Sequence, residues 1–207
     1  PKMSYIEYGP IMWGYNSTRS APASKKQKKV LHILHASTFK AIPATRPWIF
    51  ETSDEFYEGV KDLIQVVSKI ENIFLTIRFR PIPECSLKSL KELALYSKNV
   101  EIKSDGLFVD DLNMTDLLIS NSSTTIEEAI TLNKNVLLWG YGARYSHSQG
   151  NTNYNSINDN AKNKEMLRDE IILIRDLNLN NKELSSHHVT KTLKNVDDFV
   201  INSFLNK

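Results

Sequence analysis

The sequence predicts an α/β fold, a Rossmann-like, doubly wound domain around a parallel β-sheet. Short apolar runs that suit buried strands recur between residues 30 and 140. Segments of helical periodicity, often 10–16 residues long, lie between them, separated by capping and turn residues. Strands that alternate with helices of this length form βαβ units, in which helices cover both faces of a parallel sheet.

The predicted strands are residues 30–36, 73–79, 100–103, 116–120 and 136–139, and the predicted helices are residues 55–70, 87–96 and 124–132. The first helix follows a plausible N-cap in the segment Thr52-Ser-Asp54. Its apolar residues stand at helical spacing: Phe56, Val60, Leu63, Ile64, Val67 and Ile70. His32 and His35 are three residues apart on a strand and therefore face opposite sides of the sheet, which argues against a metal pair.

The two ends of the chain differ in character from this central region. Residues 1–29 show no sustained period, so we expect a linker or N-terminal arm, with the lysine cluster of residues 25–29 solvated. Residues 30–207 form the predicted domain. It includes a polar, asparagine-rich loop at about residues 146–164, a further strand at Ile171-Ile-Leu-Ile174 and a C-terminal helix over residues 189–205.

Composition excludes several classes of function. Lys and Arg number 26 against 24 Asp and Glu, so no overall basic charge points to nucleic acid. The single cysteine, Cys85, excludes an internal disulfide and fits a reducing compartment. No apolar run approaches the roughly 18 residues of a membrane-spanning helix. Because the chain starts with Pro1 and not Met, we expect it to be a fragment of a longer protein.

Small polar side chains gather where the fourth strand ends, in Ile119-Ser-Asn-Ser-Ser-Thr-Thr-Ile-Glu-Glu-Ala129. Ligands of open α/β sheets bind beyond the carboxyl ends of the strands. The free N–H groups and dipole of a helix N-terminus, together with neighbouring hydroxyls, can form an anion site. The segment Thr124-Thr-Ile-Glu127 also fits a capping box. The segment therefore predicts a well-capped helix, a phosphate site, or both.

The segment from Asp116 to Leu138 resembles the "D-hydrophobic-S-x-S-S/G-x-x-x-x-E-A-x-x-x-G-K-P-V" stretch in the C-terminal, donor-binding domain of GT-B glycosyltransferases. Non-hydrolysing UDP-N-acetylglucosamine 2-epimerases and the CDP-glycerol glycerophosphotransferase family share this stretch. The resemblance implies that Ser122, Ser123 and Thr124 contact the diphosphate of a nucleotide donor, with Asn121 in the same turn. It further implies that Glu128 holds the ribose hydroxyls, which leaves Glu127 to the capping box.

Two further stretches resemble the same domain. Residues 30–39 are similar to its first strand and following loop, which makes Ser37 and Thr38 candidate donor contacts. Residues 75–81 are similar to an R/K-x-H-P motif of capsule and teichoic-acid transferases, with Arg80 in place of the histidine. This change removes the role of the imidazole but keeps a cation that can face phosphate. Asn133-Lys-Asn-Val136 departs from Gly-Lys-Pro-Val, although Asn133 can adopt the left-handed conformation that Gly usually supplies.

The segment Trp139-Gly-Tyr-Gly-Ala-Arg-Tyr-Ser-His147 leaves the fifth strand at the edge where ligands bind. Gly140 and Gly142 would allow close backbone approach, and Arg144, Tyr145 and His147 could contact a sugar or phosphate. A β-turn with exposed aromatic residues is an equal alternative.

The resemblance implies a glycosyltransferase, or a related glycerophosphate transferase, of bacterial surface polysaccharide synthesis, with this chain as the donor-binding half of a GT-B architecture. Arg80 and Arg144 are candidate stabilisers of the leaving group. We expect no metal, because no Asp-x-Asp pair stands at a strand end and Asp110-Asp111 lies in a predicted loop. We also expect no cofactor beyond the donor substrate, a nucleotide-diphosphate sugar or a CDP-activated group.

The expected acceptor is a saccharide or a lipid-linked molecule, bound through a missing N-terminal domain that also supplies the general base. The isolated chain should then bind nucleotide without turnover, in the cytoplasm or at the inner face of the membrane, with peripheral association at most. Two alternatives remain: a sugar-nucleotide epimerase of the same fold, and a non-catalytic α/β interaction module in which the Ser/Thr-rich turn only caps a helix.

Overall fold

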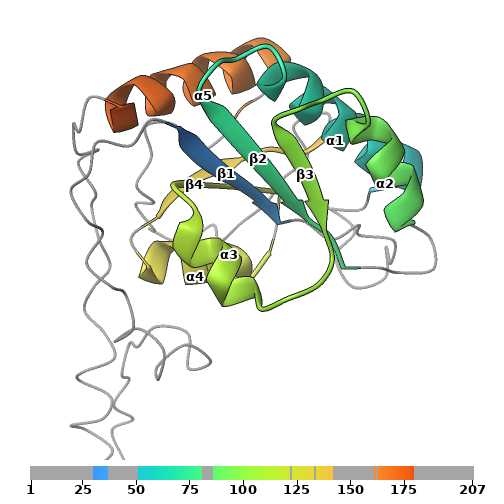
Figure 1. Ribbon diagram of the computed structural model, residues 1–207, viewed down its shortest axis with the longest axis horizontal. Coiled ribbons are helices and arrows are strands. Elements are labelled where there is room, and N and C mark those ends of the chain that lie inside the picture. The colour runs from blue at the N-terminus through green and yellow to red at the C-terminus, as the bar shows by residue number, and fades with distance from the viewer. Residues whose placement is uncertain are drawn as a thin grey trace, which may run out of the picture.

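A computed structural model of the chain describes residues 30–36, 51–80, 86–121, 123–132, 134–141, 161 and 163–179. The strands are β1 (Leu31–Ala36), β2 (Ile73–Arg78), β3 (Val100–Lys103), β4 (Leu117–Ser120) and β5 (Asn135–Leu138). The helices are α1 (Ser53–Val67), α2 (Leu87–Ala94), α3 (Phe108–Met114), α4 (Thr125–Thr131) and α5 (Lys164–Leu179). Strands and helices alternate along the chain up to β5, which confirms the predicted α/β class (Figure 1).

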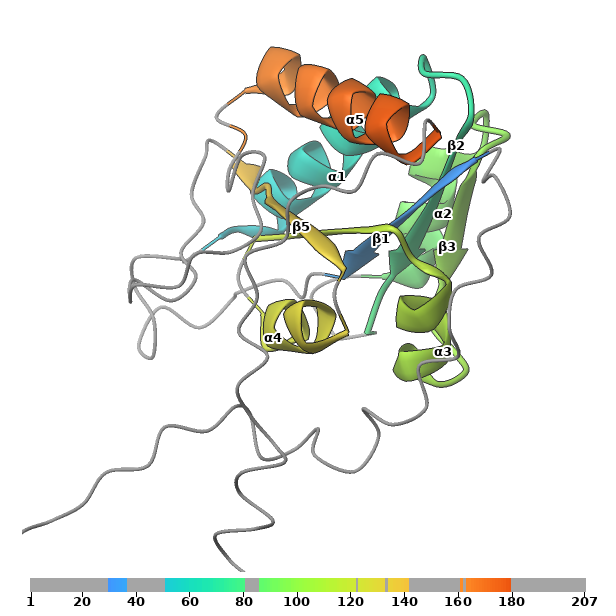
Figure 2. The same ribbon diagram turned by 90° about the vertical axis from the view of Figure 1, so that its left-hand side faces the viewer.

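The five strands form one parallel sheet in the order β3-β2-β1-β4-β5. Helices α1, α2 and α5 cover one face of the sheet, and α3 and α4 cover the other (Figure 2). The chain winds outward from β1 to β3, crosses to the opposite face through α3, and returns to β4 beside β1. The strand order therefore reverses between β1 and β4, which is where ligands of doubly wound sheets bind.

Each face of the sheet has its own hydrophobic core. Alternate residues of β1 show the division: Leu31 and Ile33 pack toward α1 and α5, whereas Leu34 and Ala36 pack toward α3 and α4. This alternation follows from the two-residue period of a strand. The strands carry apolar residues on both faces because helices cover both, as the sequence predicted.

Helix α1 forms as expected from its apolar periodicity. The predicted apolar residues Phe56, Val60, Leu63, Ile64, Val67 and Ile70 are all buried. Thr52 is the N-cap and takes part in a capping box: its hydroxyl accepts the Glu55 amide at 3.2 Å, and the Glu55 carboxylate accepts the Thr52 amide at 2.9 Å. Two orphan amide groups at the start of the helix are thereby satisfied.

The prediction of a strand at Ile171-Ile-Leu-Ile174 is wrong, because these residues lie within α5. The four consecutive apolar residues resemble a strand when read alone. However, Leu167, Ile171 and Ile174 stand four and three residues apart, and all three are buried on one face of the helix. Leu173 is 42% exposed, as expected for the opposite face.

The prediction that Asp110 and Asp111 lie in a loop is also wrong, because both belong to α3. This helix has no side-chain cap, so tertiary contacts hold it in place. The carboxylate of Asp111 accepts hydrogen bonds from the Arg78 guanidinium and, at 2.6 Å, from Lys103 Nζ. Arg78 also donates to the carbonyl of Asp105 at 2.6 Å and of Gly106 at 2.5 Å, which fixes the turn before α3.

Several expectations fall outside the described residues: the arm at residues 1–29, most of the polar loop at residues 146–164 and the C-terminal helix at residues 189–205. Among the described helices, none is both long and apolar enough to cross a membrane.

Candidate functional site

The carboxyl ends of β1, β4 and β5 meet at one edge of the sheet. Residues that end or follow these strands, such as His35, Asn121 and Trp139, line a common pocket there with residues from the start of α1. The β1–β4 register pairs His35 with Ile119, so the last residues of the two strands lie side by side. Ser120 Oγ donates to the Ala36 carbonyl oxygen at 2.9 Å, and this buried bond joins the two strand ends at the switch point.

The predicted phosphate turn begins directly after this bond. Asn121 is 3% exposed, Ser123 is half-buried and Thr124 is exposed. Ser123 Oγ accepts the Thr125 amide at 3.3 Å, and the Ser123 carbonyl accepts the Ile126 amide at 3.1 Å. Ser123 therefore contributes to the start of α4, while the Thr124 side chain remains accessible to a ligand. The side chain of Glu127 lies outside the described part of the chain, so the capping box stays a prediction.

Glu128 lies on the first turns of α4, where its backbone amide donates to the Thr124 carbonyl oxygen at 3.3 Å. Its side chain is only 6% exposed. A carboxylate is seldom buried to this degree unless it is paired or hydrogen-bonded. The helix thus holds an acidic group one turn beyond the Ser/Thr turn, and its contact with a ribose stays a prediction.

The remaining predicted site residues divide into two groups. Arg80 is exposed and follows β2, the strand next to β1, so its cation stands at the same edge of the sheet. Ser37, Thr38, Ser122 and Arg144 lie outside the residues that the structure describes. Their roles as donor contacts and leaving-group stabilisers stay predictions.

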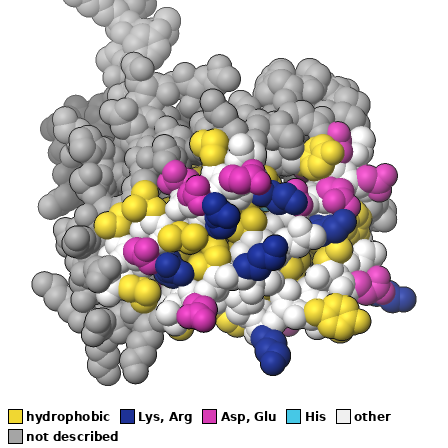
Figure 3. Space-filling model, turned by 90° about the horizontal axis from the view of Figure 1, so that it is seen from above, with side chains coloured by type: hydrophobic (Ala, Val, Ile, Leu, Met, Phe, Trp, Pro, Cys, Tyr) yellow, Lys and Arg dark blue, Asp and Glu magenta, His cyan; other side chains and the backbone are white. Residues whose placement is uncertain are grey.

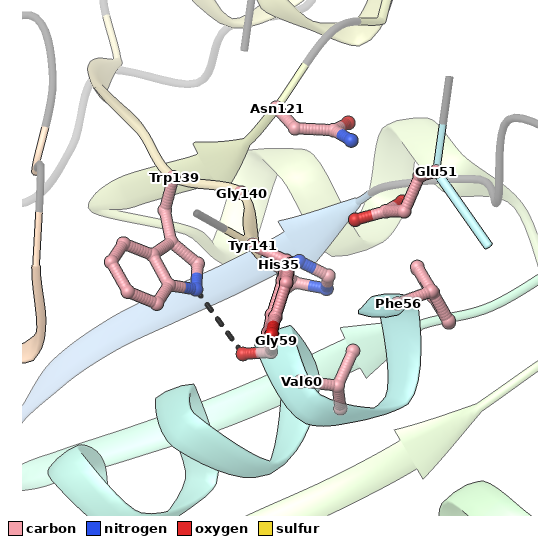
Figure 4. A pocket seen from close by; sticks show the side chains of 9 residues that line it. All are labelled: His35, Glu51, Phe56, Gly59, Val60, Asn121, Trp139, Gly140 and Tyr141. Carbon is pink, nitrogen blue, oxygen red and sulfur yellow. Dashed lines mark hydrogen bonds between the residues drawn. The ribbon is translucent and has the colours of Figure 1, made fainter. Parts of the chain in front are cut away.

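Sequence analysis did not predict the pocket shown in Figure 4. It is lined by His35, Glu51, Phe56, Gly59, Val60, Asn121, Trp139, Gly140 and Tyr141. The imidazole of His35 occupies its centre, between the carboxyl group of Glu51 and the indole of Trp139 (Figure 4). These residues come from four separate stretches of chain. Gly140, which the sequence predicted would allow close backbone approach, is buried and belongs to the pocket lining.

One wall of the pocket is held by a contact between β5 and α1. Trp139 follows β5, and its indole Nε1 donates to the carbonyl oxygen of Gly59, within α1, at 3.2 Å. A side-chain Cβ at Gly59 would lie 3.4 Å from the Tyr141 backbone nitrogen. This is an ordinary van der Waals distance, so α1 and the segment that follows β5 lie in contact at Gly59.

His35 is 4% exposed, and burial lowers its pKa to about 4. The imidazole is therefore neutral at pH 7. As expected, His32 lies on the opposite face of the strand, where its ring centroid is 6.0 Å from that of Phe74. Within the described ranges, no group of three or more His, Cys, Asp or Glu side chains could hold a metal ion.

The face that carries α5 and α1 has a mixed charge (Figure 3). Basic and acidic side chains alternate there and pair with one another, as in Lys164 with Asp62 at 3.0 Å and Arg168 with Asp169 at 2.9 Å. This face therefore does not present the single-sign basic surface that binding to a nucleic-acid backbone requires.

Comparison with known proteins gives structural matches but no sequence family. No family model matches the chain, and no curated protein matches it. A structure of UDP-GlcNAc 2-epimerase from Neisseria meningitidis, bound to UDP-GlcNAc, has a TM-score of 0.59 and 13% identity over 87% of this chain and 45% of that one. A Listeria monocytogenes structure assigned to the same epimerase class has a TM-score of 0.59 and 12% identity over 92% of this chain and 52% of that one.

A third similar structure contains a single isolated domain. It is the C-terminal domain of a group 1 family glycosyl transferase from Francisella tularensis, with a TM-score of 0.53 and 15% identity. The match covers 82% of this chain and 92% of that domain, whereas the chain spans about half the length of the two epimerases. The chain thus has the Rossmann-like α/β fold of a GT-B C-terminal domain, as its sequence predicted.

Proposed function

We propose that this chain is the donor-binding half of a GT-B glycosyltransferase of bacterial surface polysaccharide synthesis. The observation that carries the proposal is the placement of the Asn121–Thr124 turn and the buried Glu128 beside the switch point of the sheet. This is the position where doubly wound folds bind ligands. A protein with the same fold has been crystallised with UDP-GlcNAc bound.

Each side chain of the turn has a role in this proposal. Ser122, Ser123 and Thr124 donate hydroxyl and backbone hydrogen bonds to the diphosphate, while Glu128 accepts hydrogen bonds from the ribose hydroxyls. Because α4 has only seven residues, its dipole adds little, and the individual N–H and O–H groups make the contacts. Ser37 and Thr38, which follow β1 in the sequence, are assigned as further donor contacts.

The proposed reaction breaks the bond between the anomeric carbon and the donor phosphate oxygen. The acceptor oxygen forms the new glycosidic bond, and its proton passes to a base in a domain outside this chain. Charge develops on the departing nucleoside diphosphate, where the hydroxyls of the turn and the cation of Arg80 or Arg144 stabilise it. Donor transfer of this kind needs no cofactor, and a glycerophosphate donor could use the same anion site.

A sugar-nucleotide epimerase is the second candidate, because two of the similar structures belong to that class. The two functions differ in their need for an acceptor. An assay of the longer protein that contains this chain, supplied with a nucleotide sugar and no acceptor, separates them. A transferase leaves the sugar configuration unchanged, whereas interconversion of two nucleotide sugars would establish the epimerase instead.

The role of the turn can be tested in this chain by comparing the binding of UDP with that of uridine. We expect Thr124→Ala to weaken UDP about fivefold and to leave uridine binding unchanged, because one hydrogen bond to a charged group is lost. Ser97→Ala, a hydroxyl deletion at the opposite edge of the sheet, is the matched control. An equal loss for UDP and uridine would refute a diphosphate contact at Thr124.

A further inference from the structure

The pocket around His35 contains a buried polar atom that the fold does not satisfy. His35 is 4% exposed, and its Nδ1 has no hydrogen-bond partner among the described residues. A buried ring nitrogen without a hydrogen-bond partner destabilises the folded chain, because its interaction with water is lost and not replaced. Buried polar atoms of native proteins nearly always have a hydrogen-bond partner, and where the protein supplies none, a water or a ligand does.

The space beside the imidazole is small. The cavity has a volume of about 10 Å³, which is close to the size needed for one water-sized oxygen atom. Most lining residues are buried, whereas Tyr141 is 37% exposed and stands at the outer side. A whole sugar ring or a phosphate group cannot enter this space, but a single projecting hydroxyl can.

The chemistry of the pocket lining also favours a hydroxyl group. Because burial lowers the pKa of His35 to about 4, the ring is neutral and each nitrogen can pair with a group that both donates and accepts. The carboxyl group of Glu51 lies in the same lining (Figure 4). A carboxylate accepts hydrogen bonds from a hydroxyl, whereas it repels a phosphate oxygen.

The location connects this pocket with the proposed donor site. Asn121 belongs to both, because it lines the pocket and begins the turn assigned to the diphosphate. His35 and Asn121 come from β1 and from the end of β4, the two strands that flank the switch point. A group attached to a diphosphate held by residues 122–124 would therefore lie next to His35.

We propose that the His35 pocket receives one hydroxyl group of the glycosyl part of the donor, with His35 Nδ1 as its hydrogen-bond partner. This inference rests on the proposed function and adds to it, because it assigns sugar recognition to this half of the architecture. Seating the hydroxyl would displace any water from the cavity and satisfy the imidazole. The interaction contributes to affinity for the sugar and not for the nucleotide.

The test compares each nucleoside diphosphate with its sugar conjugate on the 207-residue chain: UDP with UDP-GlcNAc, GDP with GDP-mannose, CDP with CDP-glucose and ADP with ADP-glucose. The wild-type chain should bind one conjugate more tightly than the corresponding diphosphate. In His35→Leu, affinity for that conjugate should fall five- to tenfold, to the level of the diphosphate, whose affinity should not change. His35→Asn, which keeps an amide near the position of Nδ1, should recover part of the loss.

The outcomes separate the two proposals. If the folded wild-type chain binds no nucleotide, the proposed function fails and this inference fails with it. If nucleotide binds but the conjugate has no advantage, or if His35→Leu retains the advantage, only the His35 subsite is overturned. Should His35→Leu not fold, conjugates of deoxy-sugars replace it on the wild-type chain: removal of one hydroxyl should reproduce the loss, and unchanged affinity for every deoxy-sugar conjugate would refute the subsite.

Discussion

The indole nitrogen of Trp139 donates a hydrogen bond of 3.2 Å to the carbonyl oxygen of Gly59, residues that are 80 positions apart in the sequence. The bond joins the end of β5 to the middle of α1 and closes one wall of the His35 pocket. Gly59 also lies close to Tyr141, which follows β5 along the chain, since a Cβ added at Gly59 would be 3.4 Å from the Tyr141 backbone nitrogen. The shape of the pocket therefore depends on the packing of α1 against the end of β5.

Gly59→Ala tests how tight this packing is. The new Cβ would lie 3.4 Å from the Tyr141 nitrogen and 3.5 Å from its Cβ, which are ordinary van der Waals distances. Alanine is favoured over glycine inside a helix, so the free energy of unfolding should rise by about 0.5–1 kcal/mol in a denaturant titration. Gly106→Ala is the contrasting variant, because its φ of 77° should cost about 1 kcal/mol. A destabilised Gly59→Ala chain would show that α1 and β5 lie closer together than described.

Asp111 should be a main anchor of α3. It pairs with Arg78, and the two side chains are 11% and 15% exposed, so Asp111→Ala would leave a largely buried guanidinium without its carboxylate partner. We expect the free energy of unfolding to fall by about 2–3 kcal/mol. Asp110→Ala removes the neighbouring, exposed carboxylate and should change stability by less than about 0.5 kcal/mol. Equal effects of the two substitutions would contradict the assigned role of Asp111.

Asp111→Ala should also lower the pKa of Lys103. The hydrogen bond from Lys103 to Asp111 raises the pKa of the lysine above its ordinary value. In Asp111→Ala this cause is absent, so the pKa should fall back toward that value when it is followed by NMR. An unchanged pKa would mean that Lys103 is not paired with Asp111 in solution.

His35 should make the fold sensitive to acid. Its pKa is about 4 in the folded chain and 6.5 when unfolded, so between these values only the unfolded chain binds the proton. Neutral His35 makes its full contribution to the free energy of unfolding above pH 6.5. This contribution is lost as the pH falls toward 4, and the total loss is about 3 kcal/mol. The difference in unfolding free energy between wild type and His35→Leu, measured from pH 7.5 to 4.5, should therefore grow in favour of the variant.

Subtracting the two curves cancels the carboxylates that lie away from position 35, because their surroundings are the same in both proteins. Glu51 lines the same pocket as His35 and is the acidic residue of that lining whose titration can differ between them. Parallel curves across this range would show that His35 has the same pKa in the folded and the unfolded chain, and hence that it is open to solvent.

Local sequence patterns predicted the regular part of the fold because those patterns report burial directly. The helical spacing of Phe56, Val60 and Leu63 indicated which side of α1 faces the sheet, and all three are buried. Helix α3 was missed since it is seven residues long, has no side-chain cap and depends on Arg78 and Lys103 from other strands. Ile171–Ile174 was taken for a strand because four adjacent apolar residues conceal the longer period of α5.

The site residues that the sequence singled out in most detail are those that follow one another along the chain. Asn121, Ser123, Thr124 and Glu128 follow one strand, and they lie together at the carboxyl edge of the sheet. The His35 pocket, in contrast, combines residues from positions 35, 51, 121 and 139, and no local spacing relates them. The sequence had singled out Asn121 and Gly140 as parts of the ligand-binding edge, but nothing in it related them to His35 or Glu51.

The central claim is that the edge of the sheet beside Glu128 binds a nucleotide, and a calorimetric titration tests it most directly. The chain is titrated with UDP, CDP, GDP and CMP, beside Glu128→Gln and the exposed control Glu92→Gln on α2. The account predicts saturable binding of one nucleotide, about tenfold weaker in Glu128→Gln and unchanged in Glu92→Gln, because a charged acceptor of the ribose hydroxyls is lost. The absence of binding across the panel by a folded chain, or equal affinity of Glu128→Gln, would contradict it.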